Sequence, residues 1–140
     1  IQIKKMLAGP LLSNKKENEH IEEAIKDLSI KVSDYNLKVS SLSGGNQQKI
    51  VISKWKDMDL KILIFDEPTK GIDVNAKEDI FKVIEDYAAK GVGIIFISSD
   101  LEEVERVADR VLVLKRGNFI SELRGNDINI EKINYLALNG

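Results

Sequence analysis

The chain has 140 residues, of which 43% are hydrophobic and 31% charged, and it contains no cysteine. Its 21 basic and 23 acidic side chains give a formal net charge of −2, which argues against a nucleic-acid-binding protein that works by neutralising phosphates. The absence of cysteine excludes a disulfide framework and a thiolate metal site. The sequence shows no signal-peptide core and no apolar run near the ~20 residues that span a bilayer. We therefore expect a soluble, cytoplasmic domain with one core.

The N-terminal part of the chain is predicted to be helical. Residues 1–8 have a helix-compatible composition, and Gly9-Pro10 should end that helix because proline fixes φ and lacks an N–H donor. Apolar residues at helical spacing in segment 15–28 predict a second, amphipathic helix. These residues are Ile21, Ala24, Ile25 and Leu28. His20, the only histidine, should be a surface or structural residue of this helix.

A further helix is expected after the connection that follows. Ser43 is its predicted N-cap, and Val51 and Trp55 should share one face, with Trp55 packing beneath the helix. Three lysines of this segment form a basic cluster that we expect to be solvated. They are Lys49, Lys54 and Lys56.

The pattern then changes to that of an α/β layer. Lys61–Phe65 is a short apolar run that ends in two carboxylates, as expected for a strand buried on both faces. Segment 75–89 has helical periodicity and ends at Gly91, and 93–98 is a second apolar run. Strand, helix and strand of these lengths predict a βαβ unit.

The remainder continues this alternation. We expect a helix from Leu101, a strand at Val111–Leu114, and a hairpin turn at Arg116-Gly117-Asn118 that leads into Phe119–Leu123. A last helix should begin at about Asn129.

The first motif with chemical content is a serine followed by two glycines. Ser43 before Gly44 and Gly45 would let the backbone approach a ligand closely, and the amides of the next helix would face that ligand with the positive end of the helix dipole. This is the chemistry of an anion site. A plain turn before a helix remains the alternative for this motif alone.

The second motif is a pair of acids after a buried strand. Asp66 and Glu67 would lie at the carboxyl end of a parallel strand, where open α/β sheets bind ligands. One acid can hold Mg²⁺ through water, and the other can orient or deprotonate an attacking water. A third motif, Ser98-Ser99-Asp100, follows the next strand and should face the same site.

Together these motifs resemble one family. The order LSGGNQQK (42–49), ILIFDEPT (62–69), KGIDV (70–74), ISSDLEEV (97–104) and DRVLVLKRG (109–117) is similar to that of ATP-binding-cassette (ABC) ATPases. The residues within these motifs are most similar to those of the second cassette of the tandem ATPases of ribose-, galactose- and xylose-type sugar importers.

The resemblance implies the fold and its division. We expect the C-terminal portion of a P-loop NTPase-like α/β core with a parallel sheet, preceded by a helical subdomain that carries the signature motif. The implied boundaries are 1–58 for the partial helical subdomain, 59–126 for the core portion and 127–140 for a C-terminal helix. No glycine is followed by lysine, so the phosphate loop GxxxxGK[ST] is missing. We therefore expect the chain to be part of a longer protein.

By resemblance, Ser43, Gly44 and Gly45 contact the γ-phosphate of ATP held by the opposite cassette. Asn46 and Gln47, in the first helical turn, would add side-chain donors to the nucleotide site. On this basis Gly45→Asp is expected to abolish transport without unfolding the chain, because its carboxylate would compete for the same amides.

The resemblance also assigns roles at the strand ends. Asp66 corresponds to the acid that supports Mg²⁺, Glu67 to the catalytic base, and Asp73 to the D-loop that communicates across the cassette dimer. Ser99 occupies the catalytic switch position, where most cassettes have histidine. Its hydroxyl is shorter and uncharged, so hydrolysis at this site is expected to be weak.

The implied cofactors are ATP and Mg²⁺, and the implied partners are a second cassette, transmembrane permease subunits and, indirectly, a periplasmic or extracellular sugar-binding protein. No nucleic acid is expected, and the protein would lie on the inner face of the cell membrane. Two alternatives remain open: a degenerate cassette half that only donates its signature motif, and a soluble ABC protein that acts on ribosomes or DNA. The sugar is not specified by the sequence.

Overall fold

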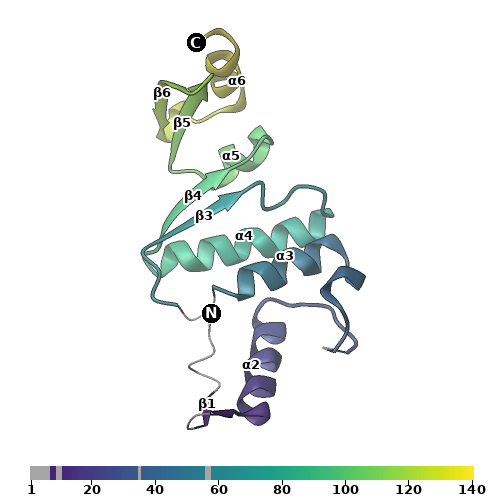
Figure 1. Ribbon diagram of the computed structural model, residues 1–140. Helices are drawn as coiled ribbons and strands as arrows, with labels where there is room; N and C mark the ends of the chain where they lie inside the picture. The colour runs from purple at the N-terminus through teal and green to yellow at the C-terminus, as the bar shows by residue number, and fades with distance from the viewer. Residues whose placement is uncertain (1–6, 9–10, 35, 56–57) are drawn as a thin grey trace. The chain divides into compact units, whose positions relative to one another are not determined.

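The computed structural model describes residues 7–8, 11–34, 36–55 and 58–140. In chain order its elements are β1 (Leu7–Ala8), β2 (Leu11–Leu12), α2 (Asn14–Asp27), η1 (Val39–Ser41), α3 (Gly44–Ser53), β3 (Ile62–Asp66), α4 (Val74–Ala89), β4 (Gly93–Ile97), α5 (Leu101–Val107), β5 (Arg110–Lys115), β6 (Asn118–Arg124), η2 (Gly125–Asp127) and α6 (Ile130–Asn139) (Figure 1). The chain forms two compact units, which comprise residues 1–61 with 69–92 and residues 62–68 with 93–140. The boundaries predicted at residues 58 and 126 stay a prediction.

The first unit begins with a short hairpin. Leu7–Ala8 pairs antiparallel with Leu11–Leu12, so the helix predicted for residues 1–8 is wrong at its last two positions. The Gly9-Pro10 dipeptide between the strands is a turn-favouring sequence, which the helix prediction used only as a stop signal. Residues 1–6 lie outside the described part of the chain.

Helix α2 is confirmed within one residue of its predicted start and end. Ser13 is its N-cap and accepts a hydrogen bond from the Lys16 backbone N at 3.4 Å, as the short hydroxyl side chain of a capping residue does. The chain after the helix is buried at Leu28 and Ile30, which are 8% and 7% exposed. These two residues anchor the end of α2 in the first unit.

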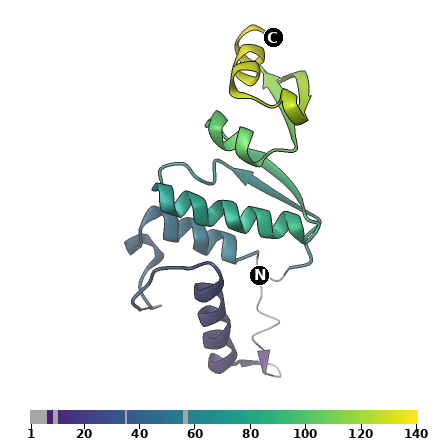
Figure 2. The same cartoon turned by 180° about the vertical axis from the view of Figure 1, so that it is seen from behind.

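Helices α3 and α4 lie side by side in the first unit, as both ribbon views show (Figures 1 and 2). Their apolar faces supply most of its core, with Ile52 from α3 and Ile80, Phe81, Val83 and Ile84 from α4. The predicted packing role of Trp55 is wrong. Helix α3 ends at Ser53, so Trp55 leaves the helical face it was predicted to share with Val51, and both side chains are exposed.

The second unit contains the predicted parallel strand pair. β3 runs parallel to β4 with Ile62 opposite Gly93 and Asp66 opposite Ile97, and α4 lies between them in sequence, which confirms the strand–helix–strand prediction. The expectation that these strands are buried on both faces is wrong. Because side chains alternate along a strand, one face of the pair is exposed in the described chain. Its apolar residues are Ile62, Ile64, Ile95 and Ile97, between 48% and 62% exposed.

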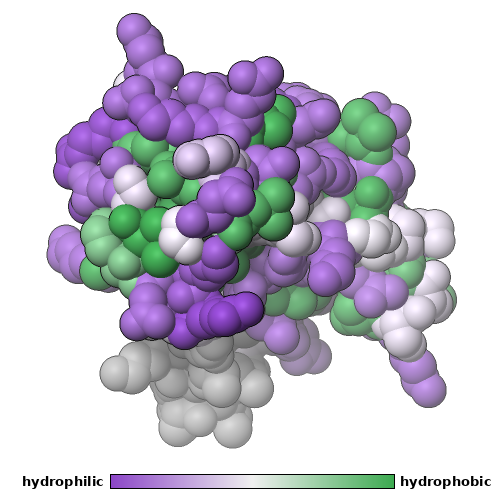
Figure 3. Space-filling model, turned by 90° about the horizontal axis from the view of Figure 1, so that it is seen from above, coloured by the Kyte–Doolittle hydropathy of each residue, from purple (hydrophilic) through white to green (hydrophobic). Residues whose placement is uncertain are grey.

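The C-terminal segment packs as a hairpin with a helix. β5 and β6 pair antiparallel around Arg116 and Gly117, whose φ angles of 49° and 78° match the type I′ turn that such short hairpins favour. Val111, Val113, Leu123 and Ile133 form the buried cluster between this hairpin and α6, which confirms the predicted hairpin and last helix. Figure 3 shows apolar side chains at the surface between the polar ones on the face it presents.

Candidate functional site

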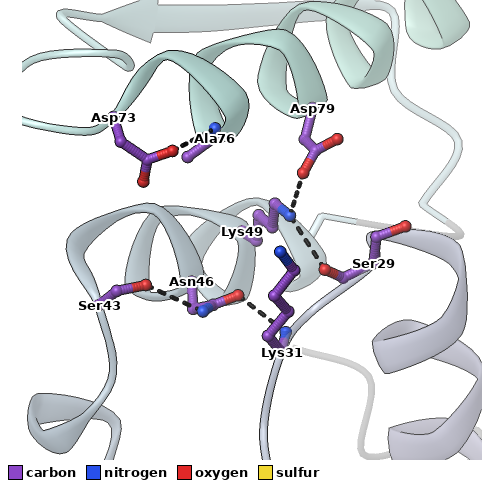
Figure 4. A network of polar contacts seen from close by, with 8 residues as sticks. All are labelled: Ser29, Lys31, Ser43, Asn46, Lys49, Asp73, Ala76 and Asp79. Atoms are coloured by element: carbon purple, nitrogen blue, oxygen red, sulfur yellow. Dashed lines mark hydrogen bonds and ion pairs between the residues drawn. The ribbon is translucent and has the colours of Figure 1, made fainter.

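We call residues 42–49 the signature segment. Ser43 is the N-cap of α3, as predicted, but its side chain does not cap the helix amides. Instead its Oγ accepts a hydrogen bond from Asn46 Nδ2 at 2.9 Å, and Asn46 Oδ1 accepts one from the Lys31 backbone N at 2.9 Å (Figure 4). Asn46 therefore connects the signature serine to the chain that follows α2.

Glycine is required at position 45 by close packing. Gly45 is buried, and a Cβ built on it would overlap the Cβ of Ala76 in the first turn of α4. A Cβ on Gly44 would lie 3.4 Å from Ile72 Cγ2, an ordinary van der Waals distance. Gly45→Asp is therefore expected to destabilise the chain as well, since any side chain at this position requires a shift in the packing of α3 on α4.

Gln47 also uses its side-chain amide within the signature segment. Its Nε2 donates to the Leu42 backbone O at 2.8 Å, and its backbone N donates to Ser43 O at 2.9 Å, the first hydrogen bond of α3. Both amide side chains that were expected to face a nucleotide, Asn46 and Gln47, thus donate to atoms of this chain. Their contact with a nucleotide stays a prediction.

Lys49 is the residue whose environment the sequence predicted wrongly. It is 3% exposed, and its Nζ donates to Asp79 Oδ2 of α4 at 2.6 Å and to Ser29 O at 3.0 Å (Figure 4). Lys54 is exposed as expected, and Lys56 lies outside the described residues. The signal that was missed is the spacing of Lys49 in the helix. The buried residues Gly45, Lys49 and Ile52 follow each other at i, i+4 and i+7, which places them on one helical face.

Asp73 starts α4. It is the N-cap of that helix, and its Oδ1 accepts a hydrogen bond from the Ala76 backbone N at 3.1 Å. Its backbone is extended, with φ −75° and ψ 162°, so the chain turns into the helix at this residue. Asp73 thus fixes the first turn of α4 at the place where Gly45 packs. Its D-loop role stays a prediction.

In the second unit, Asp66 and Glu67 lie at the carboxyl end of β3. Asp66 is the exposed last residue of the strand, and the Glu67 backbone N donates to Ile97 O of β4 at 2.9 Å. The φ of Glu67 is +48°, a left-handed conformation that costs a non-glycine residue about 1–3 kcal/mol. Strain of this kind is typical of functional positions.

Ser99 holds the Glu67 carboxylate. Its backbone N donates to Oε1 at 3.0 Å and its hydroxyl donates to Oε2 at 3.2 Å, so both oxygens are fixed by one residue at the end of the neighbouring strand. The Ser98 hydroxyl has a different partner and donates to Glu103 Oε2 at 2.8 Å. The predicted convergence of the two strand ends is confirmed for Glu67 and Ser99.

This geometry limits what Ser99 can do. A serine hydroxyl carries one hydrogen, and here that hydrogen is directed at a carboxylate. Phosphate oxygens accept hydrogen bonds, so Ser99 cannot donate to a phosphate while it donates to Glu67. In this arrangement Ser99 orients the acid.

The described residues hold no group of three or more His, Cys, Asp or Glu side chains that could bind a metal ion by themselves. His20, in α2, belongs to no such group. An exposed carboxylate such as Asp66 suits a hydrated Mg²⁺, which usually keeps several waters and takes one or two carboxylates. None of the helices in the described part of the chain has the length and apolar composition of a membrane-spanning segment.

Comparison with known proteins gives a consistent result. The family model of the ABC transporter matches residues 2–70. A ribose import ATP-binding protein, RbsA of Hahella chejuensis, is 44% identical over 133 residues, which are 95% of this chain and 26% of that protein. A xylose import ATP-binding protein, XylG of Geobacillus kaustophilus, is 44% identical over 140 residues, which are 100% of this chain and 28% of that protein.

Solved structures agree on the fold. The dimeric bacterial ABC transporter cassette MJ0796 superposes with a TM-score of 0.69 at 24% identity, over 83% of this chain and 50% of that one. The fold is therefore the α/β fold of ABC cassettes, as predicted. The chain spans about a quarter of the length of the curated relatives it matches.

Proposed function

This chain belongs to the ABC transporter family, and we propose that it is the C-terminal part of the second cassette of an ATP-hydrolysing sugar importer. The support is the 44% identity to ribose and xylose import ATP-binding proteins along nearly the whole chain. The observation that carries the proposal is the arrangement at the β3–β4 strand ends, where Asp66 is exposed beside a Glu67 carboxylate that Ser99 holds in place.

The residues present fit ATP and Mg²⁺. Bound Mg²⁺ would neutralise charge on the phosphates, and Asp66 would hold it through water. Glu67 would act as the general base toward the attacking water, a role that contributes about 10²–10⁴-fold. Its two bonds from Ser99 leave further acceptor positions on each carboxylate oxygen for that water.

The signature segment would serve a different nucleotide. Ser43, Gly44 and Gly45 would face the γ-phosphate of ATP held by a second cassette, with Asn46 and Gln47 in the same turn. The exposed backbone at Gly44 carries no side chain that blocks an approaching phosphate, and the N-terminus of α3 favours an anion. Asp73 would lie in the D-loop between the two sites.

The proposed partners follow from this assignment of the two regions to two different nucleotides. We propose a second cassette, transmembrane permease subunits and, indirectly, a periplasmic or extracellular sugar-binding protein, with the ATPase on the cytoplasmic face of the membrane. No nucleic acid is proposed as a partner, in line with the net charge of −2.

One observation favours a weaker form of the proposal, in which this half mainly donates its signature segment. The hydroxyl of Ser99 donates to Glu67, so its own site lacks the γ-phosphate donor that histidine supplies in most cassettes. Loss of one such donor costs about 10²–10³ in rate. The site that this chain completes with Ser43–Gly45 would then be the more active one.

The test uses what we call the assembled ATPase, in which this chain is joined to a phosphate-loop segment and paired with a second cassette and permease subunits. Uptake of labelled ribose or xylose that requires MgATP, and stops when the signature segment is disrupted, supports the proposal. The 140-residue chain alone should bind MgATP weakly, because the phosphate loop supplies most contacts to the nucleotide. Cosedimentation with ribosomes or DNA in place of sugar uptake would replace the proposal with the soluble alternative.

A further inference from the structure

The hydrogen bonds around Ser43 have a fixed direction. A backbone N–H can only donate, so the Asn46 side chain presents its oxygen to Lys31 at 2.9 Å. Its NH₂ group therefore points the other way, to Ser43 Oγ at 2.9 Å. Since an amide NH₂ cannot accept, the Ser43 hydroxyl is the acceptor in this pair, and its own hydrogen is directed elsewhere.

We infer that Asn46 is a positioning residue that directs the Ser43 hydroxyl hydrogen outward, toward a phosphate oxygen. This inference rests on the proposed function, because it needs a phosphate at the signature segment. Phosphate oxygens only accept hydrogen bonds, so Ser43 is useful there only as a donor. Asn46 secures that role by occupying the oxygen of Ser43.

The donor to Asn46 is itself held in place. Lys31 follows Ile30, which is 7% exposed, and the Ser29 carbonyl two residues before it accepts a hydrogen bond from the buried Lys49 Nζ at 3.0 Å. The signature helix thus binds the chain after α2 at two points, through Asn46 and through Lys49 (Figure 4). A fixed Lys31 N–H fixes the orientation of the Asn46 amide.

The decisive variant is Asn46→Asp in the assembled ATPase. Aspartate has nearly the same shape, but both of its oxygens accept, so the Lys31 bond is kept while the Ser43 hydroxyl turns its hydrogen inward. We expect ATPase activity to fall by tenfold or more, the value of about one hydrogen bond to a charged group. Asn46→Ala, which leaves the Ser43 hydrogen free to reach phosphate, should lose no more than about threefold.

A purely structural role for Asn46 predicts the opposite order. Asn46→Asp keeps the Lys31 bond and adds a negative charge to the first turn of α3, which favours the helix, so its melting temperature should equal or exceed that of the unchanged protein. Asn46→Ala removes both bonds and should melt lower. Lower activity in Asn46→Ala than in Asn46→Asp would overturn the inference.

A double-mutant cycle distinguishes electrostatic repulsion between the new carboxylate and the phosphate from the loss of the Ser43 hydroxyl as a donor. In a Ser43→Ala background, adding Asn46→Asp should lower ATPase activity by less than about a further threefold, because the hydroxyl on which Asn46 acts is gone. An undiminished tenfold loss in that background would mean charge repulsion and would overturn the inference. Asn14→Asp, which adds the same charge to the exposed first turn of α2, is the matched control and should leave activity unchanged.

Failure of the inference and failure of the proposed function give different results. If Ser43→Ala lowers activity and Asn46→Asp does not, the signature segment binds phosphate but Asn46 does not direct the hydroxyl. If neither variant lowers the turnover of an active assembled ATPase, Ser43 does not face a phosphate, and the proposed role of the signature segment fails as well.

Discussion

The signature segment and the β3–β4 strand ends differ in how much of each region is packed against other residues of this chain. Around the signature segment, Gly45, Lys49 and Ile52 are buried, and polar side chains find partners on other parts of the first unit. Beside Asp66 and Glu67, the outer apolar face of the strand pair is exposed, and the Glu67 carboxylate is held by bonds from Ser99. The first region is defined by packing and the second by hydrogen bonds at a strand end.

The largest expected effect tests which region limits ATP hydrolysis. In the assembled ATPase, Ser43→Arg should lower the steady-state rate by about 10²–10³-fold more than Glu67→Gln does. Under the proposed function, the site that contains Glu67 would lack the γ-phosphate donor that histidine supplies in most cassettes. The two rates are to be compared at matched expression and melting temperature. If Glu67→Gln is the more damaging change, Ser99 replaces histidine adequately and the proposed asymmetry between the two sites fails.

The second prediction concerns the buried ion pair beside the signature segment. Asp79→Ala should destabilise the 140-residue chain by about 3 kcal/mol, since among the described residues it leaves the buried Lys49 ammonium with the Ser29 carbonyl as its one partner. Lys49→Met should cost less, because the Asp79 side chain is 32% exposed and stays partly hydrated. Urea unfolding of both variants, with the exposed Asp86→Ala of α4 as control, measures the difference. Equal losses of unfolding free energy in Asp79→Ala and Lys49→Met would contradict the unequal burial of the two side chains.

The third prediction concerns the contact between α3 and α4. Gly45→Ala should lower the free energy of unfolding by about 2 kcal/mol, because its methyl group would overlap Ala76. Gly44→Ala has room and should change stability by less than about 0.5 kcal/mol. Adding Ala76→Gly to Gly45→Ala should restore most of the loss. Without that rescue, the close approach is not the reason for the glycine.

The smallest effect is expected on the exposed face of the strand pair. Ile64 is 61% exposed, so Ile64→Thr should change the free energy of unfolding of the 140-residue chain by less than about 0.5 kcal/mol. The matched change Ile80→Thr, at a residue that is 0% exposed, should cost several times more. Thermal melts of the two variants decide this, and a large loss for Ile64→Thr would mean that this face is covered in solution.

Local patterns were sufficient to predict most elements. The stripe of α2, the strand–helix–strand order from β3 to β4 and the turn at Arg116–Gly117 depend on periodicity, turn residues and backbone preferences within a few residues. The same holds for the motif set, because Ser43, Asp66 and Glu67 are recognisable from their neighbours in sequence. Their order along the chain was enough to identify the family.

Tertiary structure decided which of these residues are buried and what they contact. Lys49 is part of a basic cluster in sequence, but the approach of α4 supplies Asp79 and makes it a buried cation. The glycine at position 45 is required by Ala76, a residue 31 positions away. The isoleucines of β3 have the composition of a fully buried strand, yet one face is exposed, because burial depends on what packs against a strand and its own sequence does not contain that information.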